Sequence, residues 1–489
     1  MAQLNPKSEQ RIIYSSFNGG LNLSVPPESL SRNELTEAMN VEYSSSTGAM
    51  TVRGGLMKLA GLGMTARSVA KLPGRRGFLA VGADNETKYF TWNRVKAVSG
   101  EESGKHEISA VQWEDYYLVA SGGKLQKFTD RYEPRLETIE GSPDYCRMVF
   151  VRNGRVGVVT SGNMLRFSSV GDCESWGNDP EDDSTGQYIE VGYKDGMSIN
   201  AVIPLSRDLI VFKSPENEPD KGTIFRLTGD YPDWSLLEVA HNTGTYSPRS
   251  VQAVGNEVYY ASVTGLASLS AVTSYGEIQA VWPDRKVNAV LRRELSSDAE
   301  LWNIPEKQQL WLKPQTGSKE LWVLDYSGGI WTKFRFPAEV IYADGTDDTA
   351  YVFMGNDVYG LMSWKADDDV GTLKTDINAT LRMGTLITGN QVLVKRAFVS
   401  FRIQPECRAE LKLGKFRMSF SHDVTPDRIY DAPNDTDIAY EDSDPLIGAE
   451  RVITSRRQCL VRGWTVTPEV EMTGGGCALS TMGLSVAEV

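Results

Sequence analysis

The sequence has few of the residues that build catalytic and metal sites. It contains only three histidines, His106, His241 and His422, and no H-E-x-x-H pair, which argues against a zinc site or a histidine-based triad. Neither a G-x-S-x-G elbow nor a G-x-x-x-x-G-K-[ST] loop occurs. We therefore expect no catalytic residue, no bound metal and no cofactor.

Cysteine is also scarce. The five cysteines are odd in number, widely spaced and never in a C-x-x-C pair: Cys146, Cys173, Cys407, Cys459 and Cys477. This pattern disfavours a disulfide framework and a thiolate metal site, so we expect free thiols.

Long hydrophobic runs are absent as well. Nowhere do eighteen apolar residues follow one another, and the opening MAQLNPKSEQR has no apolar segment of the kind a signal peptide needs. We expect a protein that is made in the cytoplasm and does not insert into membranes. The net charge of −13 and the pI near 5.0 disfavour tight binding of nucleic acid through phosphate neutralisation.

The sequence is rich in residues that suit many short strands, with 45 glycines, 20 tyrosines and 11 tryptophans. Apolar hairpins with Gly, Asn or Asp turns recur at intervals averaging about 45 residues, the spacing of propeller blades. They begin at Phe78, Tyr116, Val156, Leu209, Val258, Gln309 and Tyr351. We therefore predict an all-β chain with a β-propeller of about seven blades over residues 61–365. An array of β-sandwiches is the structural alternative.

The two ends of the chain differ from this repeat. Strands that alternate apolar and polar residues predict a C-terminal antiparallel β-sandwich over residues 366–489. Residues 1–60 are rich in Gly, Ser, Asn and Pro and predict an extended N-terminal arm that makes assembly contacts. Short helices are expected near Leu30 and Val287.

The arm carries a resemblance to a known family. It reads FNGGLNLSVPPESL from Phe17 and NELTEAMNVEYSSSTGAMTVRGG from Asn33. This resembles the opening of the packaged-DNA stabilisation, tail hub or tail nozzle proteins of short-tailed bacteriophages (podoviruses). The matching positions are Phe17, Gly19, Gly20, Asn22, Ala38, Asn40, Gly48, Arg53 and Gly55, and Met50 departs from the usual Leu.

The resemblance implies a structural virion protein of the phage tail, assembled in the host cytoplasm and without enzymatic activity. It implies a homo-oligomeric ring, generally a hexamer, between the portal or head–tail adaptor protein and a tail spike, fibre or needle protein. Genomic double-stranded DNA would pass through the ring without sequence-specific binding, held in before ejection and conducted out during it. An acidic wall suits such a conduit, because it does not bind its cargo.

Two groups of residues are the expected assembly interface. The first comes from the arm: Phe17, Gly19, Gly20, Asn22, Asn40 and Arg53. The second is Lys412, Lys415 and Arg417, from a basic block over residues 390–418 that precedes an acidic block over residues 419–450. Opposite charge in adjoining blocks predicts steering of one subunit onto the next.

Other functions remain open at this stage. A propeller that binds a receptor or a glycan is the main alternative, and a glycan-cleaving enzyme is a further one. The acidic clusters Glu181–Asp183, Asp347–Asp348 and Asp367–Asp369 could hold Ca²⁺, but none has the spacing of a dedicated calcium loop. Solvated acidic loops explain them better.

Overall fold

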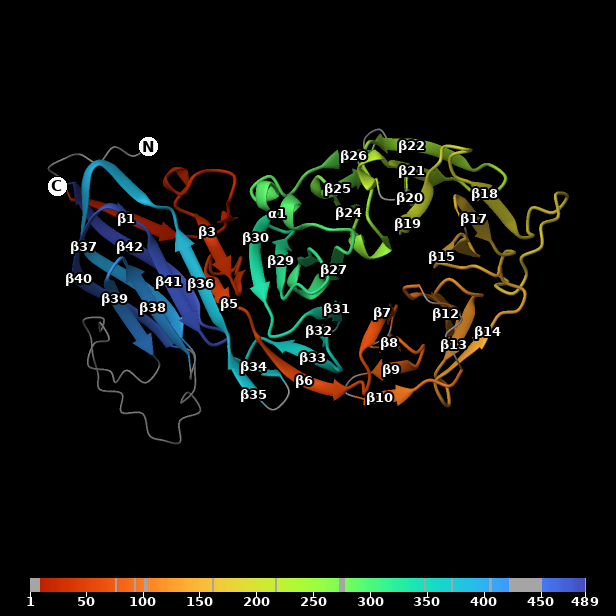
Figure 1. The fold of residues 1–489 in the computed structure, drawn as a ribbon, viewed down its shortest axis with the longest axis horizontal. Coiled ribbons are helices and arrows are strands. Elements are labelled where there is room, and N and C mark those ends of the chain that lie inside the picture. Colours follow the sequence, from red (N-terminus) through yellow and green to blue (C-terminus); the bar gives the residue numbers. More distant parts are fainter. Residues whose placement is uncertain are drawn as a thin grey trace. The chain divides into compact units, whose positions relative to one another are not determined.

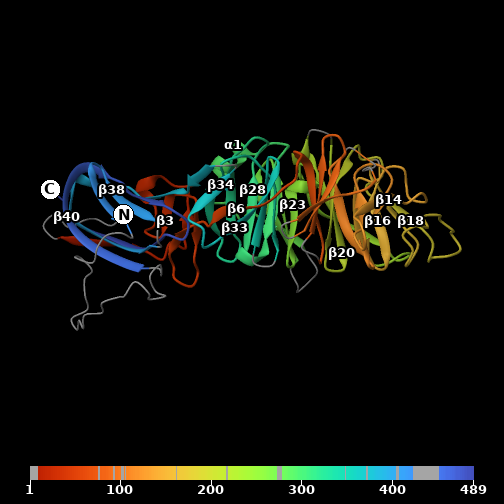
Figure 2. The same cartoon turned by 90° about the horizontal axis from the view of Figure 1, so that it is seen from below.

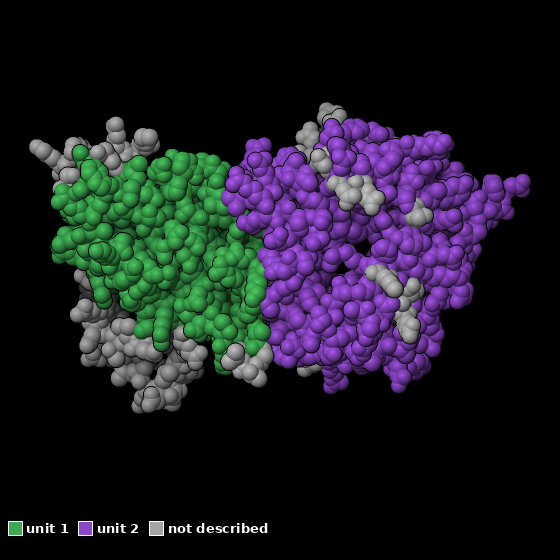
Figure 3. All heavy atoms as spheres, viewed as in Figure 1, with its two compact units in different colours: residues 1–57, 319–337, 361–489 green, residues 58–318, 338–360 purple. Residues whose placement is uncertain are grey.

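The computed structural model describes residues 9–74, 77–91, 94–100, 104, 106–160, 162–215, 218–271, 278–346, 349–370, 373–403, 407–421 and 451–488. The chain divides into two compact units, which Figure 3 colours separately. Unit 1 comprises residues 1–57, 319–337 and 361–489, and unit 2 comprises residues 58–318 and 338–360. Strands dominate both units, so the all-β prediction is confirmed. Among the described residues, no helix is long and apolar enough to span a membrane.

Seven strands lie side by side in a closed ring around the centre of unit 2 (Figure 1). In order they are β7 (Ala66–Leu72), β11 (Ser109–Trp113), β15 (Met148–Arg152), β19 (Ser198–Leu205), β23 (Val251–Val254), β27 (Glu300–Ile304) and β31 (Val340–Thr346). Each neighbours the next, and β31 neighbours β7. This arrangement is the inner wall of a β-propeller.

Six of these strands begin complete four-stranded antiparallel blades, and β27 pairs with β28 (Gln309–Lys313) at the remaining position. The blade count is therefore six to seven, which agrees with the prediction of about seven. The other strands of the first three blades are β8 (Gly77–Gly82), β9 (Thr87–Thr91), β10 (Arg94–Ala97), β12 (Tyr116–Ala120), β13 (Gln126–Thr129), β14 (Arg135–Thr138), β16 (Arg155–Val159), β17 (Met164–Phe167) and β18 (Gln187–Glu190). Those of the next two are β20 (Asp208–Ser214), β21 (Thr223–Thr228), β22 (Ser235–His241), β24 (Glu257–Ser262), β25 (Gly265–Ala271) and β26 (Ile278–Val281).

The last blade closes the ring with a strand from the other end of the propeller sequence. Its order is β31, β32 (Thr349–Met354), β33 (Asp357–Met362) and β6 (Gly55–Gly61). Because β6 precedes the first blade in the chain, the closing sheet joins the start of the propeller to its end. Phe78 of the first blade then packs against Phe353 of the last, with ring centroids 5.3 Å apart. The hydrophobic core of unit 2 lies between successive blades in this way.

Unit 1 is built from three distant parts of the chain. One sheet has the order β4 (Val41–Tyr43), β5 (Met50–Val52), β42 (Ala478–Glu488), β37 (Leu386–Ile403) and β40 (Arg451–Val466), and β1 (Gln10–Ser15) also pairs with β42. The second has the order β29 (Glu320–Asp325), β30 (Ile330–Arg335), β3 (Glu34–Met39), β36 (Asn378–Met383), β41 (Pro468–Thr473), β38 (Arg408–Leu413) and β39 (Phe416–Ser421). The short strand β2 (Gly20–Leu21) pairs with β3, and β34 (Asp367–Val370) pairs with β35 (Leu373–Asp376). The long strands curve, so the sheet around β40 is curled (Figure 2).

The N-terminal residues differ from the extended arm expected from their composition. Strands β1, β3 and β5 pair with strands of the C-terminal part, so residues 9–57 belong to the same compact unit as residues 361–488. The expected boundaries at residues 60 and 365 therefore do not coincide with the limits of the units. The low apolar content of this segment did not indicate that it packs into a compact unit. Close backbone contacts hold the segment instead: a Cβ on Gly20 (φ +59°) would lie 2.7 Å from Ile330.

Of the two predicted helices, one is correct. Residues Asn288–Glu294 form α1. The prediction near Leu30 is wrong, because Glu34–Met39 form the strand β3, in which Leu35 and Ala38 are buried. Pairing with β36 decides the conformation of this segment, and its i, i+3 apolar spacing fits a helix only locally.

Candidate functional site

The centre of the propeller holds a cavity of about 810 Å³. All seven innermost strands, or the residues directly before them, contribute to its wall, and Figure 3 shows unit 2 hollowed near its middle. The lining combines apolar side chains with charged ones, and the charged ones include Arg67, Arg147, Arg249, Glu107 and Glu300. The cavity is the channel of the propeller.

Polar bonds join each blade to the next around this channel. The seven steps are Ile108 N to Ser68 Oγ (3.0 Å), Val149 N to Ser109 Oγ (3.3 Å), Arg147 to the Ile199 carbonyl, Asn200 Nδ2 to Thr245 O (3.1 Å), Gln252 Nε2 to Leu301 O (2.9 Å), Lys313 Nζ to Val340 O (3.0 Å) and Lys71 Nζ to Gly345 O (2.7 Å). Each of the seven joins a side chain to a backbone group. The ring is thus fastened at every blade-to-blade step.

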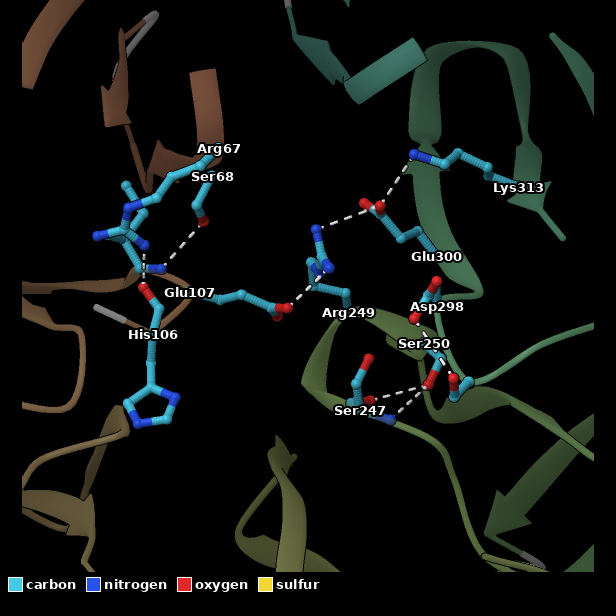
Figure 4. A network of polar contacts seen from close by, with 12 residues as sticks. Arg67, Ser68, His106, Glu107, Ser247, Arg249, Ser250, Asp298, Glu300 and Lys313 are labelled. Carbon is cyan, nitrogen blue, oxygen red and sulfur yellow. Dashed lines mark hydrogen bonds and ion pairs between the residues drawn. The ribbon is translucent and has the colours of Figure 1, made fainter. Parts of the chain in front are cut away.

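One ion pair crosses the channel instead of following it. Arg249 lies in the 3-10 turn Pro248–Ser250 ahead of the fifth blade, and its Nη2 is 2.7 Å from Oε1 of Glu107, which precedes the second blade. Its Nη1 is 3.2 Å from Oε1 of Glu300, the first residue of β27. Figure 4 shows Arg249 between the two carboxylates. Since the second and fifth blades are not neighbours in the ring, this bridge spans the channel.

The bridge continues into the wall through Lys313. The Lys313 side chain is almost completely buried, and its Nζ lies 3.1 Å from Glu300 Oε1 and 3.0 Å from Glu339 Oε1. Burial is the main effect on both acids that face Arg249, and it raises the pKa of Glu107 and of Glu300 above their ordinary values. The Arg249 and Lys313 cations oppose this shift.

Three buried atoms of the bridge have no hydrogen-bond partner among the described residues: Glu107 Oε2, Glu300 Oε2 and Arg249 Nε. Each is an unsatisfied polar group, which typically costs about 1 to 3 kcal/mol. No group of three or more His, Cys, Asp or Glu side chains in the described parts of the chain is arranged to hold a metal ion. The ion pairs of this network can fix the second, fifth and following blades relative to one another.

A second buried polar cluster lies in unit 1 and is centred on Arg53. Its Nη1 and Nη2 lie 3.0 and 2.7 Å from the two carboxylate oxygens of Asp368, and its Nε donates to Asn40 Oδ1 at 3.3 Å. Nη1 and Nη2 also donate to the carbonyls of Gly54 and Arg335. All five N–H groups of this guanidinium are thus bonded. We call Asn40, Arg53, Arg335 and Asp368 the Arg53 joint, since these residues come from all three segments of unit 1.

The arm residues predicted for the assembly interface are mostly inside unit 1. Phe17, Asn22, Asn40 and Arg53 are buried, with Phe17 at 0% and Arg53 at 1% exposure. Gly19 and Gly20 pack tightly, because a Cβ on Gly19 would lie 2.6 Å from the Asn33 carbonyl. These buried side chains make contacts within unit 1. They would influence assembly only by stabilising the fold of that unit.

The basic residues predicted for the same interface lie on β38 and β39 or their turn. Lys412 pairs with Glu471 of the adjacent strand β41, and Glu469 lies 3.8 Å away. Lys415 is exposed in the turn. Arg417 donates to the Gly414 carbonyl at 2.6 Å. The structure therefore brings these three residues together on one hairpin, apart from the Arg53 joint.

The remaining candidate groups have local partners. His106 Nε2 lies 2.9 Å from the Tyr145 hydroxyl and His241 lies 3.1 Å from Glu238, while His422, Asp347 and Asp348 lie outside the described residues. Asp182 accepts from Ser184, and Lys365 binds Asp367 and Asp369. All five cysteines are free, as predicted.

A smaller pocket of about 340 Å³ lies in the third and fourth blades. Tyr231 and Trp234 line it together with Asn153 and Asp230. Trp234 packs against Phe167 with ring centroids 4.8 Å apart, so one part of the tryptophan surface is already covered.

The residues of the channel bridge were missed in the sequence. Glu300 and Lys313 did carry a signal, because each is a charged residue at the end of a strand whose neighbours, such as Leu301 and Leu312, are apolar. Arg249 and Glu107 gave none. Their pairing depends on the second and fifth blades facing one another across the channel, which the order of residues does not reveal.

Comparisons with known proteins give no family assignment. No protein-family model and no curated protein sequence matches the chain. Among solved structures, the WD40 β-propeller domain of Doa1 is similar with a TM-score of 0.41 and 12% identity, over 63% of this chain and 95% of that one. BamB from Moraxella catarrhalis gives 0.38 and 10%, over 74% and 97%. The extracellular domain of the putative one-component system BT4673 from B. thetaiotaomicron gives 0.45 and 11%, over 83% and 61%. At these values, the propeller assignment rests on the sheet order described above.

Proposed function

We propose that this chain is a structural subunit of the tail of a short-tailed bacteriophage, and that copies of it form a nozzle or hub ring next to the portal or adaptor. The observation that carries the proposal is the Arg53 joint. Asn40 and Arg53 belong to the phrases that resemble the phage proteins. Arg53 donates to Asn40 and forms a buried ion pair with Asp368, 315 residues away in the chain. Because this motif depends on such a distant partner, its resemblance to the phage proteins supports a similar fold of the whole unit more strongly than a resemblance of a local turn would.

The propeller channel also bears on the route of the DNA. The Glu107–Arg249–Glu300 bridge crosses that channel, so in this proposal DNA does not pass through any single propeller. It passes through the space that a ring of copies encloses. The net charge of −13 suits such a wall, since it does not hold phosphates tightly.

Counting copies in purified tailed particles tests this function. Quantitative mass spectrometry should find about one copy of this chain for every two portal subunits, because symmetric rings of six and twelve would stack on one axis. Absence of the chain from particles would refute the tail assignment.

A glycan-binding propeller is the second candidate, favoured by the pocket beside Trp234. Aromatic faces next to amide and carboxylate groups are typical of small-ligand sites. In that case Trp234→Ala should abolish binding of purified bacterial surface polysaccharide, with Trp364→Ala as a matched control, since Trp364 is exposed and lies outside this pocket. A polysaccharide that is bound and then shortened would instead indicate a glycan-cleaving enzyme.

A further inference from the structure

The curled sheet of unit 1 ends in a long strand with an open edge. Strand β40 has 16 residues and pairs with β37, and the sheet order stops at β40 among the described residues. A typical strand has only about five or six residues. Edge strands present a row of unpaired backbone N–H and C=O groups, which another strand can pair with. The edge of β40 is therefore a large template for strand addition.

The inner face of the sheet is incompletely covered at this edge. On β37, Val394, Val399 and Phe401 are buried. Their partners on β40 are Val461, Ser455 and Ile453, in that order, and each of these is only half-buried. The side chains on this face are thus fully buried on β37 but only half-buried on β40. One more strand beside β40 would place its side chains next to these half-buried residues and extend the same face.

Apolar side chains are exposed along the same two strands. Val452, Leu460 and Trp464 on β40 are 64%, 59% and 65% exposed, and Ile387 on β37 is 52% exposed. These four make up one third of the twelve large hydrophobic side chains that are exposed in the described residues. Such gathering of apolar groups marks a contact surface more often than single exposed residues do.

The charge of β40 indicates what kind of partner fits. Its 16 residues include four arginines, Arg451, Arg456, Arg457 and Arg462, and no acid. The whole chain carries −13, so the rest of it carries −17. An acidic protein is attracted to this strand, and a second copy of this chain is such a protein.

We propose that the open edge of β40 is a self-association surface, on which a second copy of this chain extends the curled sheet. The proposal rests on the ring described under the proposed function and assigns one of its contacts. Backbone pairing gives the contact its register, the apolar side chains contribute burial, and the arginines steer the acidic copy into place.

The test uses the full-length chain and two matched double variants. Arg456→Glu with Arg462→Glu reverses two exposed charges on β40, and Arg94→Glu with Lys96→Glu makes the same change on the exposed strand β10. Sedimentation equilibrium should show that the β40 variant raises the dissociation constant of self-association at least about tenfold, which corresponds to about 1.4 kcal/mol. The β10 control should leave it within about twofold of wild type.

A second double variant, together with an unfolding measurement, distinguishes loss of the β40 contact from loss of the fold. Leu460→Ser with Trp464→Ser removes exposed apolar groups without changing charge, and should weaken association at high salt as well as at low salt. Each variant is checked by thermal unfolding. Folded β40 variants that associate like wild type would overturn the assignment of this edge.

The outcomes also separate this inference from the proposed function. If the chain is present in tail particles and the β40 variants still enter them, the tail function stands and the β40 contact is wrong. If the purified chain associates through β40 but is absent from tail particles, the contact stands and the tail function is wrong.

Discussion

The two units of this chain reach a stable β-fold by opposite routes. Unit 2 repeats one hairpin theme, and its blades bond mainly to blades that are close in the sequence, as in the contact between Ser109 and Val149. Unit 1 gathers three separate segments, and the Arg53 joint spans 315 residues of sequence. Repetition distributes stability over many similar contacts, whereas a non-local unit concentrates it in few.

The difference extends to the buried charges. In unit 2 the bridge around Arg249 leaves three buried polar atoms without a partner among the described residues, and one third of the Arg249 side chain is exposed. In unit 1 all five N–H groups of Arg53 are bonded, and its side chain is 1% exposed. A fully satisfied buried pair rigidifies what it joins, while a partly satisfied one is closer to breaking. The units should therefore respond very differently to single substitutions.

The largest expected effect is in unit 1. Arg53→Met leaves Asp368 buried without its cation, and breaking such a pair typically costs about 3 to 5 kcal/mol. Hydrogen exchange followed by mass spectrometry should show lost protection in β3, β36 and β5, with the blades of unit 2 protected as before. Arg53→Lys keeps the charge but not the bidentate contact with Asp368. Its loss of protection should therefore lie between those of wild type and Arg53→Met. Equal loss in both units would contradict the comparison.

The second effect is a pH dependence in unit 2, at the step that closes the ring. Burial raises the pKa of Asp344, the partner of Lys71, from its usual 3.8 to about 6. A folded-state pKa above the unfolded one means that the folded state holds the proton more tightly between pH 4 and 6, so stability from this group is lost as pH rises through that window. About two pKa units correspond to about 3 kcal/mol.

Denaturant titrations of wild type and Asp344→Asn between pH 4 and pH 7 measure this effect. The wild type should lose up to about 3 kcal/mol relative to the variant as the pH rises, because asparagine does not titrate. Parallel pH profiles for the two proteins would mean that Asp344 keeps an ordinary pKa in the folded ring.

The same contrast explains how much the sequence predicted. The propeller was visible because each blade repeats apolar strands around a turn, and the hairpins beginning at Phe78 and Tyr351 do lie on blades that pack together. Unit 1 could be predicted only in part, because Gly20 and Arg53 contact partners hundreds of residues away in the chain. Its C-terminal strands alternate and were recognised, whereas the strand β3 looked helical because its apolar spacing says nothing about pairing with β36.

A smaller effect is expected from breaking the bridge across the channel. Arg249→Met removes the ion pairs to Glu107 and Glu300, but Lys313 still binds Glu300 and the seven bonds around the ring remain. The partial exposure of Arg249 reduces the loss to about 1 kcal/mol. Urea denaturation measures it, with Lys313→Met as the comparison, which should cost more because Lys313 is buried. A larger loss for Arg249→Met than for Lys313→Met would make the bridge the main support of the ring.

The smallest effect on stability is expected on the hairpin of β38 and β39. Lys412, Lys415 and Arg417 are partly or fully exposed, and surface ion pairs contribute about 0 to 1 kcal/mol each, so replacing all three by Gln should change the unfolding free energy little. Charges on a surface act instead on encounter, which falls with salt. If this hairpin steers subunits together, the triple variant should assemble slowly at low salt and approach wild type at high salt, as followed by light scattering. Assembly at the wild-type rate at low salt would remove the hairpin from the interface, and the self-association of unit 1 would then rest on the β40 edge alone.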